Sequence, residues 1–491
     1  MKVLLIQPPY TIFRTEEKKC HPPLGLAYLA AAIKNKHDIV ILDALAEGYS
    51  QEYHFEKQFL RYGLPFEEIK KRIEEIKPDV VGVSCLFSTQ SENAHKVCAI
   101  VKEIDKKIIT VMGGAHPSAI PEEVLADNNV DFVIIGEGED TLNKLLTNLE
   151  YNGNIQAQDL DGIAFRYNDG FKVNRKSYFK EDLDGASLPY WEIFPLEKYF
   201  TINNPHGGVV KNTPFLPVIT SRGCPFECIF CSIHNVWGRN YRKRSAENVL
   251  LELDYLTKKF GIKEILFEDD NLTLDKERAK AIFKGMADKN FNLSWSVPNG
   301  IAVQTLDEEM LVLMKNSGCY RISLGIESGD EFVLKKIIKK PTIPKIITPI
   351  INKAKELGLE TIAFFVIGFP GETPTHIKNT FYYAERLGVD IVNLFFAIPL
   401  PGTRLLEICR EKELIKGKLN YNRLRSDQPY FETEDLSRDY LISIVYREKI
   451  KLYFLSLLLN PRKFLSKLWN KLITNPAYFS RFMLKYIGNH A

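Results

Sequence analysis

Three cysteines within eight residues carry the clearest chemical signal in the chain. Cys224, Cys228 and Cys231 are spaced C-x3-C-x2-C. A loop of this length can place three thiolates on three corners of a cubane iron–sulfur cluster, whereas structural clusters usually have four cysteine ligands. Three ligands on a four-iron cluster leave one iron open to bind and activate a substrate. The spacing therefore predicts a catalytic [4Fe-4S] cluster.

Two other interpretations of these cysteines stay open at this point. A zinc site would require a fourth Cys or His ligand, and His234 is close enough in sequence to be considered. The three cysteines could also be unrelated core residues. The remaining cysteines have no spacing typical of disulfides, which indicates a reducing, cytoplasmic environment. They are Cys20, Cys85, Cys98, Cys319 and Cys409.

The elements around the cysteines predict a barrel-like domain. Residues 215–220 form a short apolar run typical of a buried strand, and this run leads into the cysteine loop. Further strands, separated by helical patterns, are expected at 262–268, 293–297, 320–326, 360–367 and 391–397. We expect these six β-α units to form a partial (β/α)6 barrel over residues 216–425, with its chemistry at the carboxyl ends of the strands.

The residues before the barrel predict an α/β domain of the Rossmann or flavodoxin-like type. Apolar strands at 2–6, 38–42, 80–84, 108–112 and 132–135 alternate with helical patterns, which are clearest at 66–76 and 91–104. This alternation predicts a doubly wound parallel sheet over residues 1–150. Such sheets bind ligands at the carboxyl ends of their strands. Residues 151–215 predict a linker that contains a β-hairpin, because two extended runs flank Asn168-Asp-Gly170.

The cysteine motif, with Phe230 directly before its last cysteine, resembles the signature of the radical S-adenosylmethionine (SAM) superfamily. The resemblance implies that Cys224, Cys228 and Cys231 hold the cluster and that the open iron chelates the amino and carboxylate groups of SAM. It also implies that an electron from the cluster cleaves SAM to methionine and a 5′-deoxyadenosyl radical. A reductant such as ferredoxin or flavodoxin would supply that electron, under anaerobic conditions.

The expected strand ends of the barrel are similar to the same family. The second, fourth and fifth ends match segments that contact, respectively, the amino end of SAM, its ribose and carboxylate, and its adenine. The implied SAM-binding residues are Glu268, Asp269, Asp270, Glu327, Ser328, Gly368, Pro370 and Gly371, with Phe230 beside the cluster. One departure is at the third end, where many relatives have an arginine and this chain has Pro298-Asn-Gly300.

The first domain resembles the cobalamin-binding domain found N-terminal to one radical SAM subclass, in which the strand-end loops hold the corrin ring and its nucleotide tail. The implied cobalamin-binding residues are Pro8, Ser84, Ser88, Thr89, Gly113, Gly114, His116, Gly136, Glu137, Gly138 and Glu139. Many such domains carry D-x-H-x-x-G, whose histidine binds cobalt, but this chain has no such motif. His21 and His116 are the remaining local candidates, although a loop histidine is more often a hydrogen-bonding group. The alternative is a flavodoxin-like domain with a structural or regulatory role.

Taken together, the resemblances imply a cobalamin-dependent radical SAM enzyme that methylates an unactivated carbon through methylcobalamin. One alternative is an oxidative cyclase or a carbon–carbon bond-forming enzyme, as among relatives of the anaerobic magnesium-protoporphyrin ester cyclase. Another is a non-catalytic corrinoid or iron–sulfur carrier, against which the SAM-type strand ends count. The motifs do not identify the substrate.

The charge of the chain is concentrated at its C-terminal end. The net charge of +3 over 491 residues argues against a nucleic-acid binder, and no apolar run reaches the ~18–20 residues of a membrane-spanning helix. From residue 441 to residue 491, Lys and Arg outnumber acids nine to one. Residues 426–491 therefore predict a basic helical region, which could cap the barrel or lie on an anionic membrane. Membrane contact would make the enzyme peripheral at the inner membrane face and favour a lipid-like substrate over other small molecules.

Overall fold

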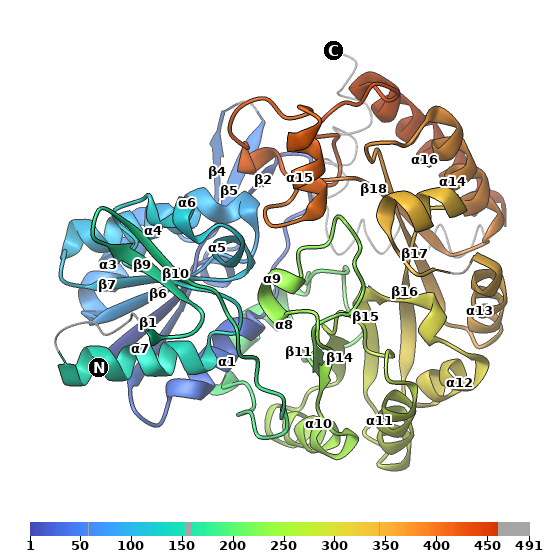
Figure 1. Ribbon diagram of the computed structural model, residues 1–491. Coiled ribbons are helices and arrows are strands. Elements are labelled where there is room, and N and C mark those ends of the chain that lie inside the picture. The colour runs from blue at the N-terminus through green and yellow to red at the C-terminus, as the bar shows by residue number, and fades with distance from the viewer. Residues whose placement is uncertain (57, 153–158, 343, 460–491) are drawn as a thin grey trace.

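An N-terminal α/β domain lies beside a larger barrel-like domain in the computed structural model, which describes residues 1–56, 58–152, 159–342 and 344–459 (Figure 1). The N-terminal sheet runs in the order β10-β9-β8-β7-β6-β1-β3. Its parallel strands are β1 (Lys2–Gln7), β3 (Asp38–Asp43), β6 (Val80–Ser84), β7 (Ile109–Gly113) and β8 (Phe132–Ile134).

Helices cover both faces of this sheet because successive strand residues point to opposite faces. Val3 and Leu5 of β1 belong to the apolar cluster that includes α1 (Leu24–Ile33) and α7 (Glu139–Asn152). Leu4 and Ile6 belong to the opposite cluster with α3 (Phe66–Ile76) and α4 (Ser91–Ile104). The prediction of a doubly wound parallel sheet is confirmed.

The hairpin of β9 (Ile163–Tyr167) and β10 (Gly170–Asn174) belongs to the N-terminal sheet. The sequence placed it in a linker, but β9 pairs antiparallel with β8, and Phe165 lies opposite Phe132. The physical reason is the open edge of β8, which offers unpaired backbone groups to a strand whose residues Ile163 and Ala164 are fully buried. The first domain therefore extends to Asn174 rather than ending near residue 150.

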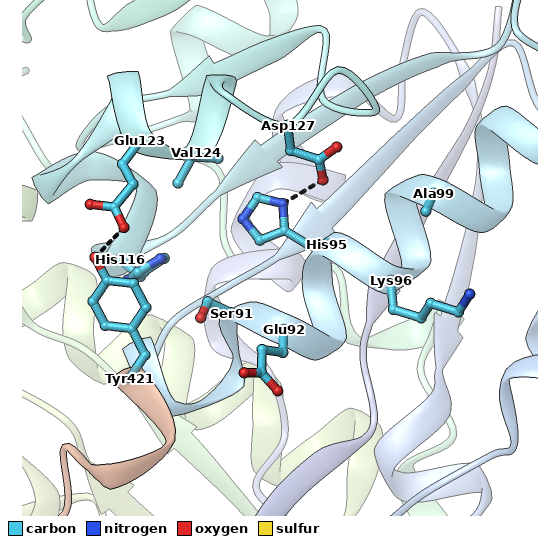
Figure 2. A pocket seen from close by; sticks show the side chains of 10 residues that line it. All are labelled: Ser91, Glu92, His95, Lys96, Ala99, His116, Glu123, Val124, Asp127 and Tyr421. Atoms are coloured by element: carbon cyan, nitrogen blue, oxygen red, sulfur yellow. Dashed lines mark hydrogen bonds and ion pairs between the residues drawn. The ribbon is translucent and has the colours of Figure 1, made fainter. Parts of the chain in front are cut away.

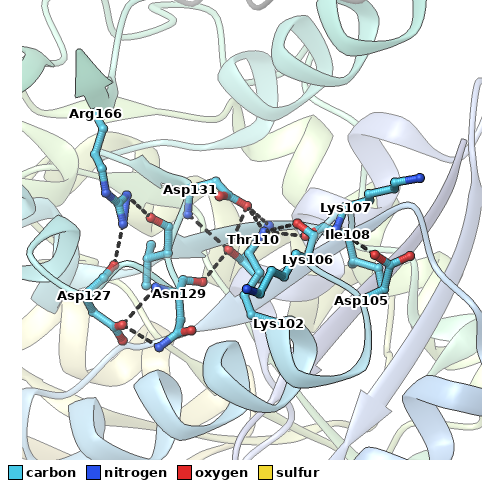
Figure 3. A network of polar contacts seen from close by, with 11 residues as sticks. Lys102, Asp105, Lys106, Lys107, Ile108, Thr110, Asp127, Asn129, Asp131 and Arg166 are labelled. Atoms are coloured by element: carbon cyan, nitrogen blue, oxygen red, sulfur yellow. Dashed lines mark hydrogen bonds and ion pairs between the residues drawn. The ribbon is translucent and has the colours of Figure 1, made fainter. Parts of the chain in front are cut away.

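A polar network fastens the hairpin to the loop between β7 and β8 (Figure 3). The Arg166 guanidinium of β9 donates hydrogen bonds of 2.6 Å to the carbonyls of Val130 and Asp127. The Asp131 carboxylate accepts hydrogen bonds from the Thr110 amide (2.8 Å) and from Lys102 Nζ (2.6 Å) on α4. These contacts satisfy the carbonyls at the turn before β8.

The sequence did not predict the small antiparallel sheet of β2 (Tyr10–Phe13), β5 (Phe59–Tyr62) and β4 (Glu52–Phe55). β2 follows β1 directly after the buried Pro8 and Pro9 and so leaves the carboxyl edge of the main sheet. Arg425, from the far end of the chain, donates a 2.7 Å hydrogen bond to the Thr11 carbonyl. This sheet thus contacts the segment that follows the barrel.

The second domain confirms the expected partial barrel, whose sheet runs β11-β14-β15-β16-β17-β18 among the described residues, with all neighbours parallel. The strands are β11 (Phe215–Val218), β14 (Glu264–Phe267), β15 (Ser294–Ile301), β16 (Cys319–Glu327), β17 (Glu360–Ile367) and β18 (Ile391–Phe396). The intervening helices are α10 (Ala246–Phe260), α11 (Lys276–Asp288), α12 (Glu308–Asn316), α13 (Pro344–Glu356) and α14 (Pro374–Arg386), with α15 (Arg404–Glu411) after β18.

The third barrel strand is longer than the sequence indicated. β15 continues through Pro298-Asn-Gly300 to Ile301, and its pairing with β16 is irregular between Val297 and Ile301. A proline and a glycine are compatible with a strand at such an irregularity, where the ladder of hydrogen bonds is already interrupted.

The C-terminal helix α16 (Arg438–Leu459) packs on the barrel (Figure 1). Leu441, Ile444 and Val445 are buried, and Lys451 forms an ion pair with Glu385 of α14. The start of the basic region therefore acts as a cap. The rest of this basic region, which includes Arg462, Lys463, Lys467, Trp469 and Lys471, lies outside the described residues. None of the helices in the described part of the chain is long and apolar enough to cross a membrane.

Candidate active site at the junction of the two domains

The cysteine loop follows β12 (Ser221–Arg222) and is anchored along its length. Gly223 has φ +87°, and a Cβ there would lie 2.2 Å from the Asn240 carbonyl oxygen, so the turn requires glycine. In the middle of the loop, Ile229 donates a 3.0 Å hydrogen bond to the Ile338 carbonyl and accepts a 2.8 Å bond from the Leu405 amide. The fold thus holds the loop in place from several sides.

The three thiols are half-buried and close to one another but not close enough for one zinc ion. Burial raises the pKa of Cys228 to about 12 and that of Cys231 to about 11, and neighbouring cysteines add to the shift for both. A zinc ion with Zn–S bonds of about 2.3 Å would bring its sulfur ligands within ~3.8 Å of one another. The three Sγ atoms do not all lie within 4.8 Å of one another. The three thiols therefore do not form a ready-made zinc site, and they need a positive centre to ionise.

The carboxylates after β14 have three different environments. Asp269 is fully engaged in the frame of the cysteine loop, since it accepts hydrogen bonds from the Thr220 amide (3.1 Å), the Thr220 hydroxyl (2.7 Å) and the Ser221 hydroxyl (2.5 Å). Glu268 points instead toward a pair of histidines. Asp270 Oδ2 is buried and, like Glu268 Oε1, has no hydrogen-bond partner among the described residues, but Asp270 is not directed at the histidines.

Asp270 is therefore the strand-end carboxylate best suited to an incoming ammonium group. Burial, with smaller contributions from Asp269 and Glu268, raises its pKa to about 7. The charge of Asp270 also raises the pKa values of Cys224 and Cys231, which places it beside these two cysteines. A bound amino group would supply the partner that its free oxygen lacks.

The end of β16 holds a buried ion pair that the sequence did not reveal. Glu327, a non-glycine residue with φ +69°, lies 2.6 Å from Lys340 Nζ, and each side chain is about one-tenth exposed. Burial lowers the pKa of Lys340, but Glu327, Cys228 and Cys231 outweigh burial, and the net pKa is raised. A left-handed conformation here is strained and persists because its surroundings fix it. A buried cation beside the cysteines favours thiolate ligands and an anionic cluster.

Two further contacts fix the strand ends that resemble SAM-binding segments. The Ser328 hydroxyl lies 2.8 Å from the Thr380 hydroxyl on α14 and accepts a 3.1 Å hydrogen bond from the Asp330 amide. After β17, the buried Glu372 accepts hydrogen bonds from the amides of Gly368 (2.7 Å) and Phe369 (2.8 Å). Gly368 and Gly371 have φ +88° and +94°, so both positions favour glycine.

The cysteine motif also packs directly on the fifth strand end. The Phe230 ring lies 5.8 Å from that of the buried Phe369, which Pro370 follows. Leu441 of α16 covers the same loop, since a Cβ at Gly368 would lie 3.3 Å from its Cδ1 atom. Phe230 thus packs the cysteine loop against residues 368–371, the segment that is expected to contact the adenine of SAM.

Glu137 and Glu139, which the sequence assigned to cobalamin, lie in a buried ion-pair network between the domains. Arg222, which directly precedes Gly223 and Cys224, lies 3.2 Å from Glu137 and 2.7 Å from Glu139. Arg242 also pairs with Glu137, and both arginines are almost fully buried. Burial raises the pKa of Glu139, but the Arg222 charge outweighs burial, so the net pKa is lowered. The neighbouring Gly136 faces the Val236 carbonyl, at 3.1 Å from where its Cβ would be, and Gly138 faces Leu29.

Other strand ends of the first domain remain accessible and fit a large amphipathic cofactor. A Cβ at Gly113 would meet only Ile134, at 3.9 Å, whereas Gly114 is packed against Cys85. Leu86 and Phe87, after β6, are about half exposed, at 51% and 53%. Exposed apolar side chains beside an open glycine suit the edge of a corrin ring. Ser84 and Thr89, in the same loop region, are partly exposed.

A cavity of about 460 Å³ lies next to this loop, between α4 and α6 (Pro121–Leu125) (Figure 2). The buried His116 lies 3.0 Å from the Ser88 hydroxyl through Nδ1 and packs edge-on against Tyr421. Tyr421, from the segment after the barrel, donates a 2.8 Å hydrogen bond to Glu123. Burial lowers the pKa of His116 to about 4, so the ring is neutral at pH 7. The cavity offers room for a nucleotide-like tail.

Comparisons with known proteins agree with this arrangement. A family model described as a B12 binding domain matches residues 10–146, and one described as the radical SAM superfamily matches residues 218–384. The cytidylyl-2-hydroxyethylphosphonate methyltransferase of Streptomyces wedmorensis is 36% identical over 87% of this chain and 85% of its own length. The anaerobic magnesium-protoporphyrin IX monomethyl ester cyclase of Rubrivivax gelatinosus is 27% identical over 86% of this chain and 72% of its own.

Solved structures show the same fold. The cobalamin-dependent SAM radical enzyme OxsB, with aqua-cobalamin and SAM bound, has a TM-score of 0.70 at 18% identity, covering 99% of this chain and 72% of its own. The radical SAM methyltransferase TsrM of Kitasatospora setae, with cobalamin and a [4Fe-4S] cluster bound, has a TM-score of 0.65 at 17% identity, covering 85% of this chain and 76% of its own.

Replacing Arg222 tests the ion-pair network between the domains. Arg222→Met leaves Glu137 with only Arg242 and leaves Glu139 without its arginine, so we expect the free energy of unfolding to fall by about 3–5 kcal/mol. The matched control is Lys258→Met, which removes a 2.7 Å pair with Asp254 on the exposed face of α10 and should change stability by about 0.5 kcal/mol or less. Denaturant titration measures both, and equal effects would contradict a structural role for Arg222.

Glu372 makes a pH-dependent contribution to stability. Burial raises its pKa from 4.5 to about 8. Because the folded-state pKa is the higher one, this contribution is complete below pH 4.5 and is lost as pH rises through about 8. Glu372→Gln keeps an oxygen for the Gly368 and Phe369 amides but does not titrate. We therefore expect the melting temperature of the variant to rise relative to wild type between pH 6 and pH 9. The exposed Glu74→Gln is the control, and parallel melting curves for Glu372→Gln and wild type would refute the assignment.

Proposed function

The chain belongs to the family of radical SAM enzymes that carry an N-terminal cobalamin-binding domain, and on this basis we propose that it methylates an unactivated carbon of its substrate. Its cofactors are a [4Fe-4S] cluster, SAM and cobalamin, which together supply the radical and the methyl group when bound. The observation that supports methyl transfer is the 36% identity, over most of both chains, to a relative named as a methyltransferase.

In this proposal the barrel supplies the cluster and SAM site. Cys224, Cys228 and Cys231 bind the cluster, and Asp270 receives the amino group of SAM. The further SAM-binding residues are Glu327, Ser328, Gly368, Pro370 and Gly371. Asp269 and Glu372 support these loops through the hydrogen bonds described above rather than through contact with SAM.

The first domain supplies the cobalamin site. Gly113, Leu86 and Phe87 offer the open apolar surface, and the cavity beside His116 takes the nucleotide tail. The flanking residues are Pro8, Ser84, Ser88, Thr89 and Gly114. Glu137 and Glu139 act through Arg222 and Arg242, so their contribution is to align this domain with the cluster loop.

A cyclase-type reaction is the second candidate function. The relative named as an anaerobic magnesium-protoporphyrin ester cyclase also covers most of the chain, and the same cofactor-binding residues would serve either chemistry. Both functions require that the barrel exclude water from a reactive radical.

Product counting separates the two functions. Methyl transfer at carbon should give one S-adenosylhomocysteine and one 5′-deoxyadenosine for each methylated product, measured anaerobically with a low-potential reductant such as reduced flavodoxin. Cys228→Ala should abolish both, because it removes a cluster ligand, whereas Cys319→Ala, at the buried start of β16, should retain them. Deoxyadenosine alone, with a cyclised or oxidised product, would refute methyl transfer and favour the second function.

The C-terminal part of the basic region, beyond Asn460, is relevant to the class of substrate. The substrate is a small molecule. We propose that residues beyond Asn460 contact an anionic membrane, and such contact would favour an apolar, lipid-like substrate. Full-length protein should then sediment with anionic vesicles at low salt and dissociate at high salt, whereas protein ending at Asn460 should stay in the supernatant. Equal recovery of both proteins in the supernatant would leave the tail as a structural cap.

A further inference from the structure

A histidine pair and a glutamate meet where three parts of the chain converge. His21 precedes α1 in the first domain, His206 lies in the segment between the domains, and Glu268 follows β14 of the barrel. Glu268 Oε1 lies 3.5 Å from His21 Nε2 and 3.5 Å from His206 Nδ1. One ligand atom from each of the three residues lies within 4.8 Å of the other two.

A backbone hydrogen bond brings the segments that carry the two histidines together. Cys20 donates a 2.9 Å hydrogen bond from its amide to the Asn204 carbonyl, so the residue before His21 is paired with the residue two positions before His206. The Asn204 side chain, itself buried, donates a 2.7 Å bond to the Lys18 carbonyl and accepts a 2.9 Å bond from Lys19. The two rings, 5.6 Å apart and at 80° to each other, are therefore brought together by the fold.

A neighbouring amide orients the glutamate. Asn299, on the irregular part of β15, donates hydrogen bonds to the Glu268 carbonyl (2.8 Å) and to Glu268 Oε2 (3.0 Å). Oε1 is thereby left facing the two histidines, and it has no hydrogen-bond partner among the described residues. Carboxylates that bind metals typically have their other oxygen fixed by such an outer contact.

The distances fit a shared cation better than direct hydrogen bonds. An N–H···O hydrogen bond is normally 2.7–3.2 Å long, and both His–Glu distances exceed that range. Ligands on a tetrahedral zinc ion with bonds of about 2.0–2.1 Å lie ~3.4 Å apart.

We propose that His21, His206 and Glu268 bind a divalent transition-metal ion, with zinc as the best match. Two histidines and one carboxylate are a ligand set that zinc uses in sites with an open fourth position. The His206 side chain is 42% exposed, which leaves an approach for the ion and for an oxygen ligand from water or substrate. The ion would join the first domain, the connecting segment and the barrel at one point. This inference does not depend on which reaction the enzyme catalyses.

The test is the metal content of the full-length enzyme after its cluster has been rebuilt and excess metal removed. With iron occupying the cysteines, elemental analysis should find about one zinc per chain. X-ray absorption at the zinc edge should show nitrogen and oxygen neighbours near 2.0–2.1 Å and no sulfur near 2.3 Å. Absence of zinc after dialysis against micromolar zinc, or a zinc–sulfur signal, would overturn the proposal.

Variants assign the ligands. His206→Ala, at a partly exposed position, and Glu268→Gln should each lose the zinc while keeping the iron and cobalamin content of the wild type. Asn299→Ala should weaken zinc binding about 10- to 100-fold, because it frees the Glu268 side chain. The exposed His54→Ala on β4 is the matched control and should retain zinc. Zinc retained by both ligand variants would refute the site. Loss of iron as well as zinc would mark a folding defect. In that case Glu268→Asp, which keeps a carboxylate, should retain zinc and His206→Gln, which removes the imidazole, should lose it, and the opposite result would refute the site.

Discussion

Arg222 and Arg242 are almost fully buried at the junction of the two domains, and their pairing with Glu137 and Glu139 is the interaction on which the site depends. A buried guanidinium without a carboxylate is costly, so neither domain can keep its half of the network alone. Arg222 also packs over the rings of Tyr28 and Trp237, at 5.0 and 4.9 Å. Because Cys224 follows two residues later, the network fixes the start of the cluster loop relative to the first domain.

Buried polar contacts also fix the loops at the carboxyl ends of the barrel strands. A buried polar side chain fixes each segment that is expected to contact the cluster or SAM. Asp269 accepts a hydrogen bond from Thr220 before the cysteine loop, Lys340 pairs with Glu327, and Glu372 accepts a hydrogen bond from the Gly368 amide after β17. These groups use buried hydrogen bonds and ion pairs to maintain conformations, such as the positive φ of Glu327, that the chain would not adopt by itself. The open positions, among them Oδ2 of Asp270, are then available to ligands.

Local patterns predicted much of the fold. The helices Phe66–Ile76 and Ser91–Ile104 have the bounds that the sequence indicated, because their amphipathic periodicity is a local signal. The cluster cysteines were predicted from their spacing together with the pattern of the strand ends that follow them. Pairings between distant segments were not predictable in this way. The hairpin that joins β8, the roles of Glu137 and Glu139, and the meeting of His21 with His206 all depend on contacts across more than 25 residues.

The position of Arg222 limits how such enzymes can be recombined. A barrel moved onto a different cobalamin-binding domain would carry two buried guanidinium groups to a surface that must offer carboxylates at the places of Glu137 and Glu139. Without them the cysteine loop would begin from an unsupported residue, and the distance between the two cofactors would no longer be set. The ion pairs thus couple the two domains, so an exchange of either domain must preserve all four charged side chains.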